Sequence, residues 1–334
     1  MRRGVTTAAA FEGKRVLITG GLGFIGSTLA RVLIAVGADV VLFDSLAPNY
    51  GGNRFNISGI EQRVTVHIGD IREQDALAGL VRRSDIVFNL AGQTSHLDSM
   101  HDPFTDLEIN CQSQLALLEA CRHNNPEITV VFAGTRQVYG RPQYLPVDEE
   151  HPVAPVDVNG INKAAGEWYH LLYAKIYGLN LSVLRLTNTY GPRMRVRDAR
   201  QTFLGQWLRA LVVGEELVIF GDGAQLRDFT YVDDAVAAFM LAACSEDARG
   251  EVFNLGGDRV ISLLELAELM IELNGGGSFR MQEYPPERLS IDIGDYYADF
   301  RKAGDRLAWQ PTESLEEGLA KSLAFYRMHG AHYW

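Results

Sequence analysis

Cysteine is scarce in this chain, and its few copies form neither a disulfide framework nor a metal site. The three cysteines are Cys111, Cys121 and Cys244, and none belongs to a Cys-x-x-Cys pair. An odd number of cysteines without paired spacing is typical of buried residues that act as small apolar side chains in the reducing cytoplasm. We therefore expect a cytoplasmic protein with no disulfide and no metal site.

Long apolar runs and an excess of positive charge are missing as well. No run approaches the roughly 20 apolar residues of a membrane span, and Gly4 to Ala10, after Met1-Arg2-Arg3, is too short and too polar for a signal-peptide core. The formal net charge of -11 argues against a nucleic-acid partner, because phosphate backbones bind basic surfaces. A single nucleotide needs only a few placed cations and is compatible with this charge.

The first half of the chain alternates short apolar runs with longer helical patterns. Strands are predicted at Lys14–Thr19, Asp39–Phe43, Val64–Ile68, Ile86–Leu90, Thr129–Ala133 and Leu181–Leu186. Helices are predicted at Gly26–Val36, Gln74–Arg82, Phe104–Cys121 and Gly160–Tyr177. Such alternation is typical of parallel β-α-β units with both sheet faces covered. We predict an α/β protein built on a Rossmann-type doubly wound parallel sheet.

After Tyr190-Gly191-Pro192 the alternation becomes less regular. Helices are expected at Phe203–Val212, Asp233–Ala243 and Leu263–Leu273, and short strands at Leu217–Ile219 and Val252–Leu255. We expect one Rossmann-type domain over residues 11–186, with return segments near 229–257. A smaller mixed α/β domain is expected over most of residues 187–334.

The first strand ends in the glycine-rich turn Gly20-Gly21-Leu22-Gly23-Phe24-Ile25-Gly26. Glycines without a Cβ let the backbone approach a pyrophosphate, and the helix that follows presents free N–H groups and its positive dipole end to that anion. The turn follows a strand and opens a helix, as dinucleotide binding requires. Asp44 ends the second strand, where a carboxylate binds a ribose diol and repels a 2′-phosphate. The sequence therefore predicts NAD rather than NADP.

Further motifs follow in order along the chain. They are Gly69-Asp70-Ile71-Arg72, Asn89-Leu90-Ala91-Gly92-Gln93, Ser99 with Pro103 and Asn110, Phe132 to Gly140, Arg185 to Pro192, Arg227 to Asp234, Trp309-Gln310-Pro311 and Ser314 to Leu319. With the Gly-x-x-Gly-x-x-Gly turn, this set resembles the extended short-chain dehydrogenase/reductase family. Its members include nucleotide-sugar epimerases, dehydratases and decarboxylases. The resemblance implies NAD as cofactor and a nucleotide-diphosphate sugar as substrate.

The resemblance also implies roles for individual residues. The expected NAD-binding residues are Gly20, Gly23, Phe24, Ile25, Gly26, Asp44, Asp70, Ile71, Leu90, Ala91, Gln93, Asn110 and Lys163. The expected substrate-binding residues are Thr135, Asn188, Arg193, Arg227 and Arg288. The expected catalytic residues are Thr135, Gln137, Asn159 and Lys163. The basic run Arg193, Arg195, Arg197 and Arg200 is either a solvated loop or a clamp on a diphosphate or a sugar carboxylate.

One position departs from the family pattern. Four residues before Lys163, where the family has a catalytic tyrosine, the chain has Asn159. An amide is not basic near neutral pH and cannot accept the proton of a sugar hydroxyl. Three hypotheses remain: an active enzyme that uses another acid–base group, a protein that binds NAD and a nucleotide sugar with little turnover, and an inactivated variant. For the first, the candidates are Tyr144, His96 or a group of the substrate, although loop or polar contacts are the ordinary roles of such a histidine.

The residues after Thr135 help to choose the reaction. The family's 4,6-dehydratases carry Asp-Glu there, whereas this chain has Arg136-Gln137, which argues against dehydration. The decarboxylases tend to carry Glu at the position of Gln137, but the segment from Asn188 to Met194 is closer to theirs. We expect a sugar epimerase, with decarboxylation of a nucleotide uronate as the alternative. The helices at Phe104–Cys121 and Gly160–Tyr177 correspond to the family's dimer interface, which implies a homodimer.

Overall fold

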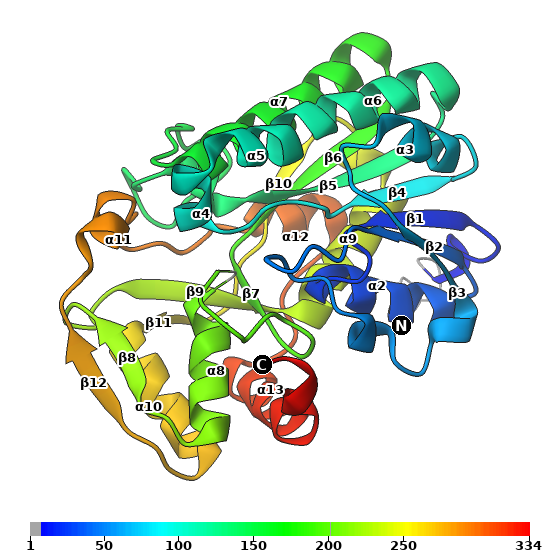
Figure 1. The fold of residues 1–334 in the computed structure, drawn as a ribbon. Coiled ribbons are helices and arrows are strands. Elements are labelled where there is room, and N and C mark those ends of the chain that lie inside the picture. Colours follow the sequence, from blue (N-terminus) through cyan, green and yellow to red (C-terminus); the bar gives the residue numbers. More distant parts are fainter. Residues whose placement is uncertain (1–7, 201) are drawn as a thin grey trace.

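A seven-stranded parallel sheet lies at the centre of the protein (Figure 1). The computed structural model describes residues 8–200 and 202–334, so the basic start Met1-Arg2-Arg3 lies outside the described residues. The strands are β1 (Arg15–Thr19), β2 (Asp39–Asp44), β3 (Val64–Ile68), β4 (Ile86–Asn89), β5 (Thr129–Thr135), β6 (Asn180–Leu186) and β10 (Val252–Asn254). Their order is β10-β6-β5-β4-β1-β2-β3. The six strands predicted in the first half are confirmed to within two residues at each end.

Both faces of this sheet are covered because successive residues of its strands point to opposite sides. In β1, Val16 and Ile18 pack toward α2 (Phe24–Ala35), α9 (Val232–Cys244) and α12 (Arg301–Leu307). Leu17 packs toward α3 (Gln74–Val81), α6 (Ser113–Asn124) and α7 (Val158–Tyr177). The strands therefore read as continuous apolar runs, and the predicted Rossmann-type fold is confirmed.

The segment predicted as one helix over Phe104–Cys121 is instead built from three pieces. They are α5 (Pro103–Leu107), a π-helical turn at Glu108–Gln112, and α6. A π turn displaces backbone partners by one residue, and the side chains of Ser113 and Gln114 donate to the Ile109 carbonyl at 2.6 and 3.0 Å. The apolar periodicity does not reveal this turn, because side-chain contacts stabilise it.

A smaller mixed unit lies beside the sheet (Figure 1). Its strands are β7 (Asn188–Tyr190), β8 (Leu217–Phe220), β9 (Leu226–Tyr231), β11 (Val260–Ser262) and β12 (Phe279–Gln282), paired as β11-β9-β7 and β12-β8. Its helices are α8 (Phe203–Val213), α10 (Leu263–Asn274), α11 (Pro286–Ser290) and α13 (Leu315–His329). Between its elements the chain returns to the large sheet, where α9 covers one face and β10 pairs with β6. No helix among the described residues is long and apolar enough to cross a membrane.

Candidate active site

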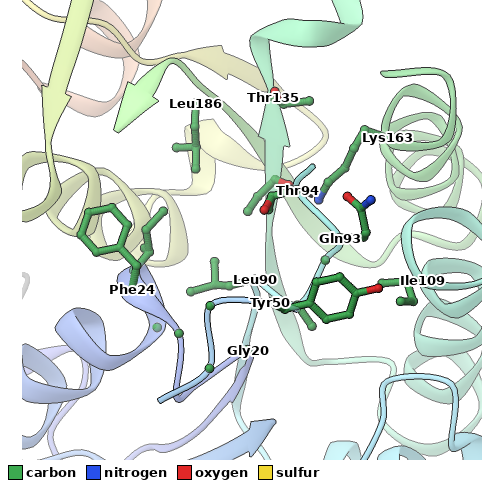
Figure 2. Close-up of a pocket in the computed structure, with 18 of the residues that line it drawn as sticks. Gly20, Phe24, Tyr50, Leu90, Gln93, Thr94, Ile109, Thr135, Lys163 and Leu186 are labelled. Atoms are coloured by element: carbon green, nitrogen blue, oxygen red, sulfur yellow. Dashed lines mark hydrogen bonds between the residues drawn. The ribbon is translucent and has the colours of Figure 1, made fainter. Parts of the chain in front are cut away.

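A cavity opens at the carboxyl ends of the central strands, and we call it the cofactor cavity (Figure 2). Of the residues predicted to bind NAD, the structure places twelve in its lining. They are Gly20, Gly23, Phe24, Ile25, Gly26, Asp44, Asp70, Ile71, Leu90, Ala91, Gln93 and Lys163. The remaining one, Asn110, is fully buried behind the cavity. The carboxyl edge of a parallel sheet, where strand order reverses, is the usual place for a dinucleotide.

The glycine turn shapes the cavity floor. Gly20 adopts a φ of +68°, and a Cβ there would lie 3.0 Å from the Leu90 carbonyl oxygen and the Ala91 nitrogen. Helix α2 begins at Phe24 after Gly23, and no side chain caps it. The unpaired N–H groups of its first turn are thus left for a ligand, as a pyrophosphate requires. The turn fits the diphosphate of a dinucleotide because both the space and the donors are present.

Asp44 stands at the end of β2 with its carboxylate already oriented. Oδ2 accepts from the Leu22 nitrogen at 3.0 Å, and Oδ1 accepts from the Leu46 nitrogen at 2.8 Å. Burial raises the pKa of Asp44, and these two backbone hydrogen bonds oppose the rise. A carboxylate held in this way has lone pairs left for a ribose diol, and no described residue places a cation beside it that could bind a 2′-phosphate.

Lys163 reaches the opposite side of the cavity from α7 (Figure 2). Its Nζ donates to the Ala133 carbonyl at 3.1 Å and lies 4.9 Å from the centre of the Phe132 ring. Burial lowers the pKa of Lys163 to about 8, with the charge of Asp106 opposing the shift. The Lys163 ammonium therefore lines the cofactor cavity from α7.

Asn159 lines the same cavity, but its amide is already bound. Nδ2 donates to the Gln93 carbonyl at 2.8 Å and to Asp106 Oδ2 at 3.0 Å. Asp106 is fully buried and also accepts from the amides of Asn110 and Asn162, at 3.0 and 2.8 Å. Asn110 holds both polar atoms of the Gln93 backbone. Asn159 thus belongs to an amide network that positions the Gln93 loop, and it has no proton-accepting group to offer.

A histidine and a buried carboxylate lie beside this network. His96, the first residue of α4 (His96–His101), has its Nδ1 3.0 Å from Asp157 Oδ2. Gln137 Nε2 donates to the same oxygen at 2.7 Å, and the Gly160 nitrogen donates to Oδ1 at 2.6 Å. Burial would raise the pKa of Asp157, but His96 and these two donors hold it below its usual value.

A second cavity adjoins the first, and we call it the substrate cavity. The two share His96, Arg136, Gln137, Asn188 and Thr202 in their linings. The substrate cavity is also lined by three further arginines, Arg200, Arg227 and Arg288. Burial lowers the pKa of Arg227 to about 10, and the charge of Arg136 adds to the effect. Arginines suit an anionic group such as a diphosphate. The same lining also carries five carboxylates, and Arg200 pairs with two of them; they are Asp98, Asp198, Glu215, Glu216 and Asp292.

Arg136 lies at the junction of the two cavities. Its Nη2 donates to Asn188 Oδ1 at 3.0 Å, and its guanidinium stands 5.1 Å from the Tyr296 ring centre. Its buried Nη1 has no hydrogen-bond partner among the described residues. No cluster of three or more metal-ligating side chains occurs within residues 8–200 and 202–334.

Comparison with known proteins agrees with this geometry. Residues 16–256 match the NAD dependent epimerase/dehydratase family. The chain belongs to this family. The UDP-glucose 4-epimerase of Mycolicibacterium smegmatis is 34% identical over 94% of this chain and 98% of its own length. The UDP-glucuronic acid decarboxylase 1 of Xenopus tropicalis is 30% identical over 96% of this chain and 73% of its own length. The UDP-glucose 4-epimerase of Thermotoga maritima, solved with UDP-glucose, superposes with a TM-score of 0.85 at 31% identity and covers 94% of this chain and 99% of that one.

As a member of the NAD dependent epimerase/dehydratase family, the chain uses NAD, and the cofactor cavity fits it. Two of the candidates taken from the sequence lie elsewhere. Arg193 donates from Nε to Thr28 at 3.2 Å and lines neither cavity, because its backbone turns it toward α2. Tyr144 also lines neither cavity; its hydroxyl donates to Asp148 at 2.7 Å, and this contact raises its pKa to about 12.

Two residues of this family member were missed at the sequence level. Asp157 carries a signal that could have been read, because an Asp before the helix that bears Lys163 is a typical N-cap. Its pairing with His96 joins residues 61 positions apart, and no local pattern encodes that. In the sequence, Arg136 is notable because it stands where the dehydratases carry an acid. A cation next to Thr135 is also a candidate for contact with the substrate, and Arg136 lines both cavities.

Proposed function

We propose that this protein is an NAD-dependent nucleotide-sugar epimerase that acts through transient oxidation of the sugar, usually at C4. The observation that carries the proposal is the junction of the two cavities. Thr135, Gln137 and His96 line the cofactor cavity, and Gln137 and His96 also line the arginine-rich substrate cavity. A sugar diphosphate held by Arg200, Arg227 and Arg288 would present its ring at that junction.

The chemistry divides between cofactor and protein. Bound NAD supplies the acceptor that takes a hydride from the sugar carbon and gives it back. The side chains of this chain bind and orient the sugar and move the hydroxyl proton. Thr135 is placed to hydrogen-bond the reacting oxygen, because it ends β5 in the cavity lining and its Oγ1 otherwise only accepts from the Gln137 nitrogen at 3.2 Å.

The residues at the junction favour epimerisation over elimination. A dehydratase needs an acid and a base to remove a second hydroxyl, and the positions after Thr135 hold Arg136 and Gln137 instead. Decarboxylation is the alternative, and two observations favour it. Nη1 of Arg136, which has no partner among the described residues, could donate to a sugar carboxylate, and the chain is similar to a uronate decarboxylase.

The purified protein should be incubated with uridine-, thymidine-, cytidine- and guanosine-linked sugars, including UDP-glucose and UDP-glucuronate. Epimerisation keeps the mass and is detected by chromatography and NMR of the released sugar. Decarboxylation is detected by mass spectrometry as loss of carbon dioxide. An epimer from any of these sugars is expected, with no product from Lys163→Met. Loss of carbon dioxide would show that decarboxylation, and not epimerisation, is the reaction. No product from any sugar would overturn both proposed activities.

We also propose that the protein is a homodimer that pairs through α5 and α7. These helices carry large apolar side chains that are exposed in the single chain: Phe104, Leu107, Ile161, Trp168, Leu172 and Ile176, with Phe104 75% and Trp168 55% exposed. Contiguous exposed apolar surface of this kind marks an interface, and identical faces pair about a two-fold axis. A second copy would bury both helices in a four-helix contact.

A further inference from the structure

We propose that His96, held by Asp157, exchanges the proton of the substrate hydroxyl in place of the tyrosine that Asn159 replaces. This inference rests on the proposed function, because it names the acid–base group of that reaction. Four observations at the junction of the cavities carry it.

The first part of the argument is position. His96 lines the cofactor cavity together with Thr135 and Lys163, and it also lines the substrate cavity. Its side chain is 37% exposed, so a ligand in the cavity can reach it. Lys163 and Asn159 line the cofactor cavity only. A group that exchanges a proton with the reacting hydroxyl must lie where the cofactor cavity and the substrate cavity meet. His96 lies there.

The second part is orientation. Asp157 Oδ2 lies 3.0 Å from Nδ1, an ion-pair contact that places the carboxylate beside this nitrogen. Among the described residues, neither ring nitrogen of His96 has a partner in a hydrogen bond of regular geometry. A carboxylate at Nδ1 favours the tautomer with the proton on that nitrogen and leaves the lone pair of Nε2 for a substrate. It also stabilises the imidazolium that forms when Nε2 accepts a proton.

The third part is the carboxylate itself. The side chain of Asp157 is completely buried, yet it stays charged because Gln137 and the Gly160 nitrogen donate to it. It also caps α7, a helix of 20 residues whose positive dipole end favours an anion there. The position of Asp157 is fixed by the start of the helix, so that of His96 is fixed as well.

The fourth part is that the other nearby groups are engaged. Both amide hydrogens of Asn159 are donated, to Gln93 and Asp106. Tyr139 is fully buried, donates to Asn254 Oδ1 at 2.7 Å, and has its pKa raised by burial. Lys163 donates to the Ala133 carbonyl.

The step is balanced as follows. Nε2 of neutral His96 takes the hydroxyl proton, the hydride on the same carbon goes to the bound cofactor, and the carbon–oxygen bond becomes a carbonyl. In the return step the hydride adds to either face of the carbonyl carbon, and His96 gives its proton back to the oxygen. His96 and the cofactor end as they began, and no other oxidant or acid is consumed.

The test compares His96→Ala and His96→Gln with the matched control His101→Ala. His101 lies on the same helix, is exposed, and lines neither cavity. Turnover is measured on the panel sugar that the unaltered enzyme converts fastest, by chromatography and NMR of the released sugar. Loss of general acid–base catalysis lowers kcat by about 10²–10⁴-fold. Both His96 variants should fall in that range with NAD affinity unchanged, and His101→Ala should stay within twofold.

Chemical rescue separates a proton-transfer role from a structural one. Imidazole added to His96→Ala should restore part of kcat, and 4-methylimidazole should restore it to a different extent because its basicity differs. Asp157→Asn keeps a helix cap but loses the charge, so it should lower kcat and leave KM for the sugar nucleotide unchanged.

The outcomes are distinct. Undiminished kcat in His96→Ala, or a loss that neither imidazole restores, would overturn the role of His96 and leave the epimerase intact. No turnover by the unaltered enzyme on any sugar nucleotide would overturn the proposed function itself, and this inference with it.

Discussion

The side-chain amide of Asn159 is bound from two sides, which determines the effect of a substitution there. Tyrosine in Asn159→Tyr has one hydroxyl in place of an NH₂ group, so Gln93 and Asp106 cannot both keep their donors. The acceptor that loses its bond keeps the one from Asn110, so the change removes one buried hydrogen bond, which costs about 0.5–1.5 kcal/mol. We expect Asn159→Tyr to lower both the melting temperature and kcat, as measured by calorimetry and by the epimerase assay. A turnover above that of the unaltered enzyme would contradict this.

Lys163 predicts a dependence of stability on pH. Its pKa is about 8 in the folded protein, against about 10.4 in an unfolded chain. Between these values the unfolded chain binds more protons, so this lysine makes the folded state more stable as pH rises. Below pH 8 both states are protonated and the penalty for burying the charge is constant.

The variant Lys163→Met removes that penalty. In the cofactor-free protein at pH 7 the free energy of unfolding should rise by up to about 3 kcal/mol, since one pKa unit corresponds to about 1.4 kcal/mol. The gain over the unaltered protein should shrink as pH rises from 8 toward 10, while NAD affinity falls at every pH. Urea unfolding at several pH values tests this, and a variant less stable at pH 7 would argue against it.

Site residues that belong to a local sequence pattern could be predicted from the sequence. Pairs of residues that are far apart in the chain and meet only in the fold could not. Gly20, Asp44 and Lys163 follow from a turn, a strand end and a helix position, and the structure places all three in one cavity. The basic run suggested Arg193, but its direction depends on a backbone φ of +74° that the sequence does not reveal. Asp157 was overlooked because its partner His96 lies in another element.

Among the elements, α7 depends on a buried ion pair with the sheet. Glu167 pairs with Arg185 of β6, whose Nη1 also donates to the Tyr139 hydroxyl at 2.5 Å, and both charged side chains are at most 5% exposed. Removing one partner of a buried pair leaves an uncompensated charge and costs about 3–5 kcal/mol. We expect that loss in Glu167→Ala, as measured by urea unfolding.

Glu316→Gln is the matched control for this prediction. Glu316 pairs with Arg259 on the surface, and both side chains are close to half exposed. Exposed pairs contribute about 0–1 kcal/mol. Equal losses in the two variants would show that burial of the Glu167 pair adds nothing.

The elements differ in how far the sequence predicts them. Short apolar runs between helical patterns specify the central strands, because burial on both faces gives a recognisable pattern. The short strands β7, β9, β11 and β12 were not predicted; β7 and β11 have three residues each, and three residues of the four in β12 are exposed. Their pairing comes from neighbours far away in the chain. The π turn after Leu107 likewise depends on Ser113 and Gln114 rather than on periodicity.

For the whole molecule, the proposed dimer gives a test in solution. Trp168→Glu together with Leu172→Glu places charges in the apolar face of α7, where each would be desolvated in a dimer. The double variant should sediment as a monomer at concentrations where the unaltered protein is a dimer. Met328→Glu, at a 78% exposed apolar residue of α13, is the control and should stay dimeric. A dimer that persists in the double variant would place the interface elsewhere.

Asp157 caps α7, the helix that carries Lys163. One helix therefore positions both the carboxylate next to His96 and the lysine that lines the cofactor cavity. Proton transfer in the proposed mechanism therefore depends on three positions, His96, Asp157 and Asn159. Hydride transfer depends on the residues that bind the cofactor, which are different ones. Grafting those three residues into an epimerase that uses tyrosine would exchange one proton acceptor for another without redesigning the cofactor pocket. Homologous folds could thus diverge in acid–base chemistry while their redox chemistry stays the same.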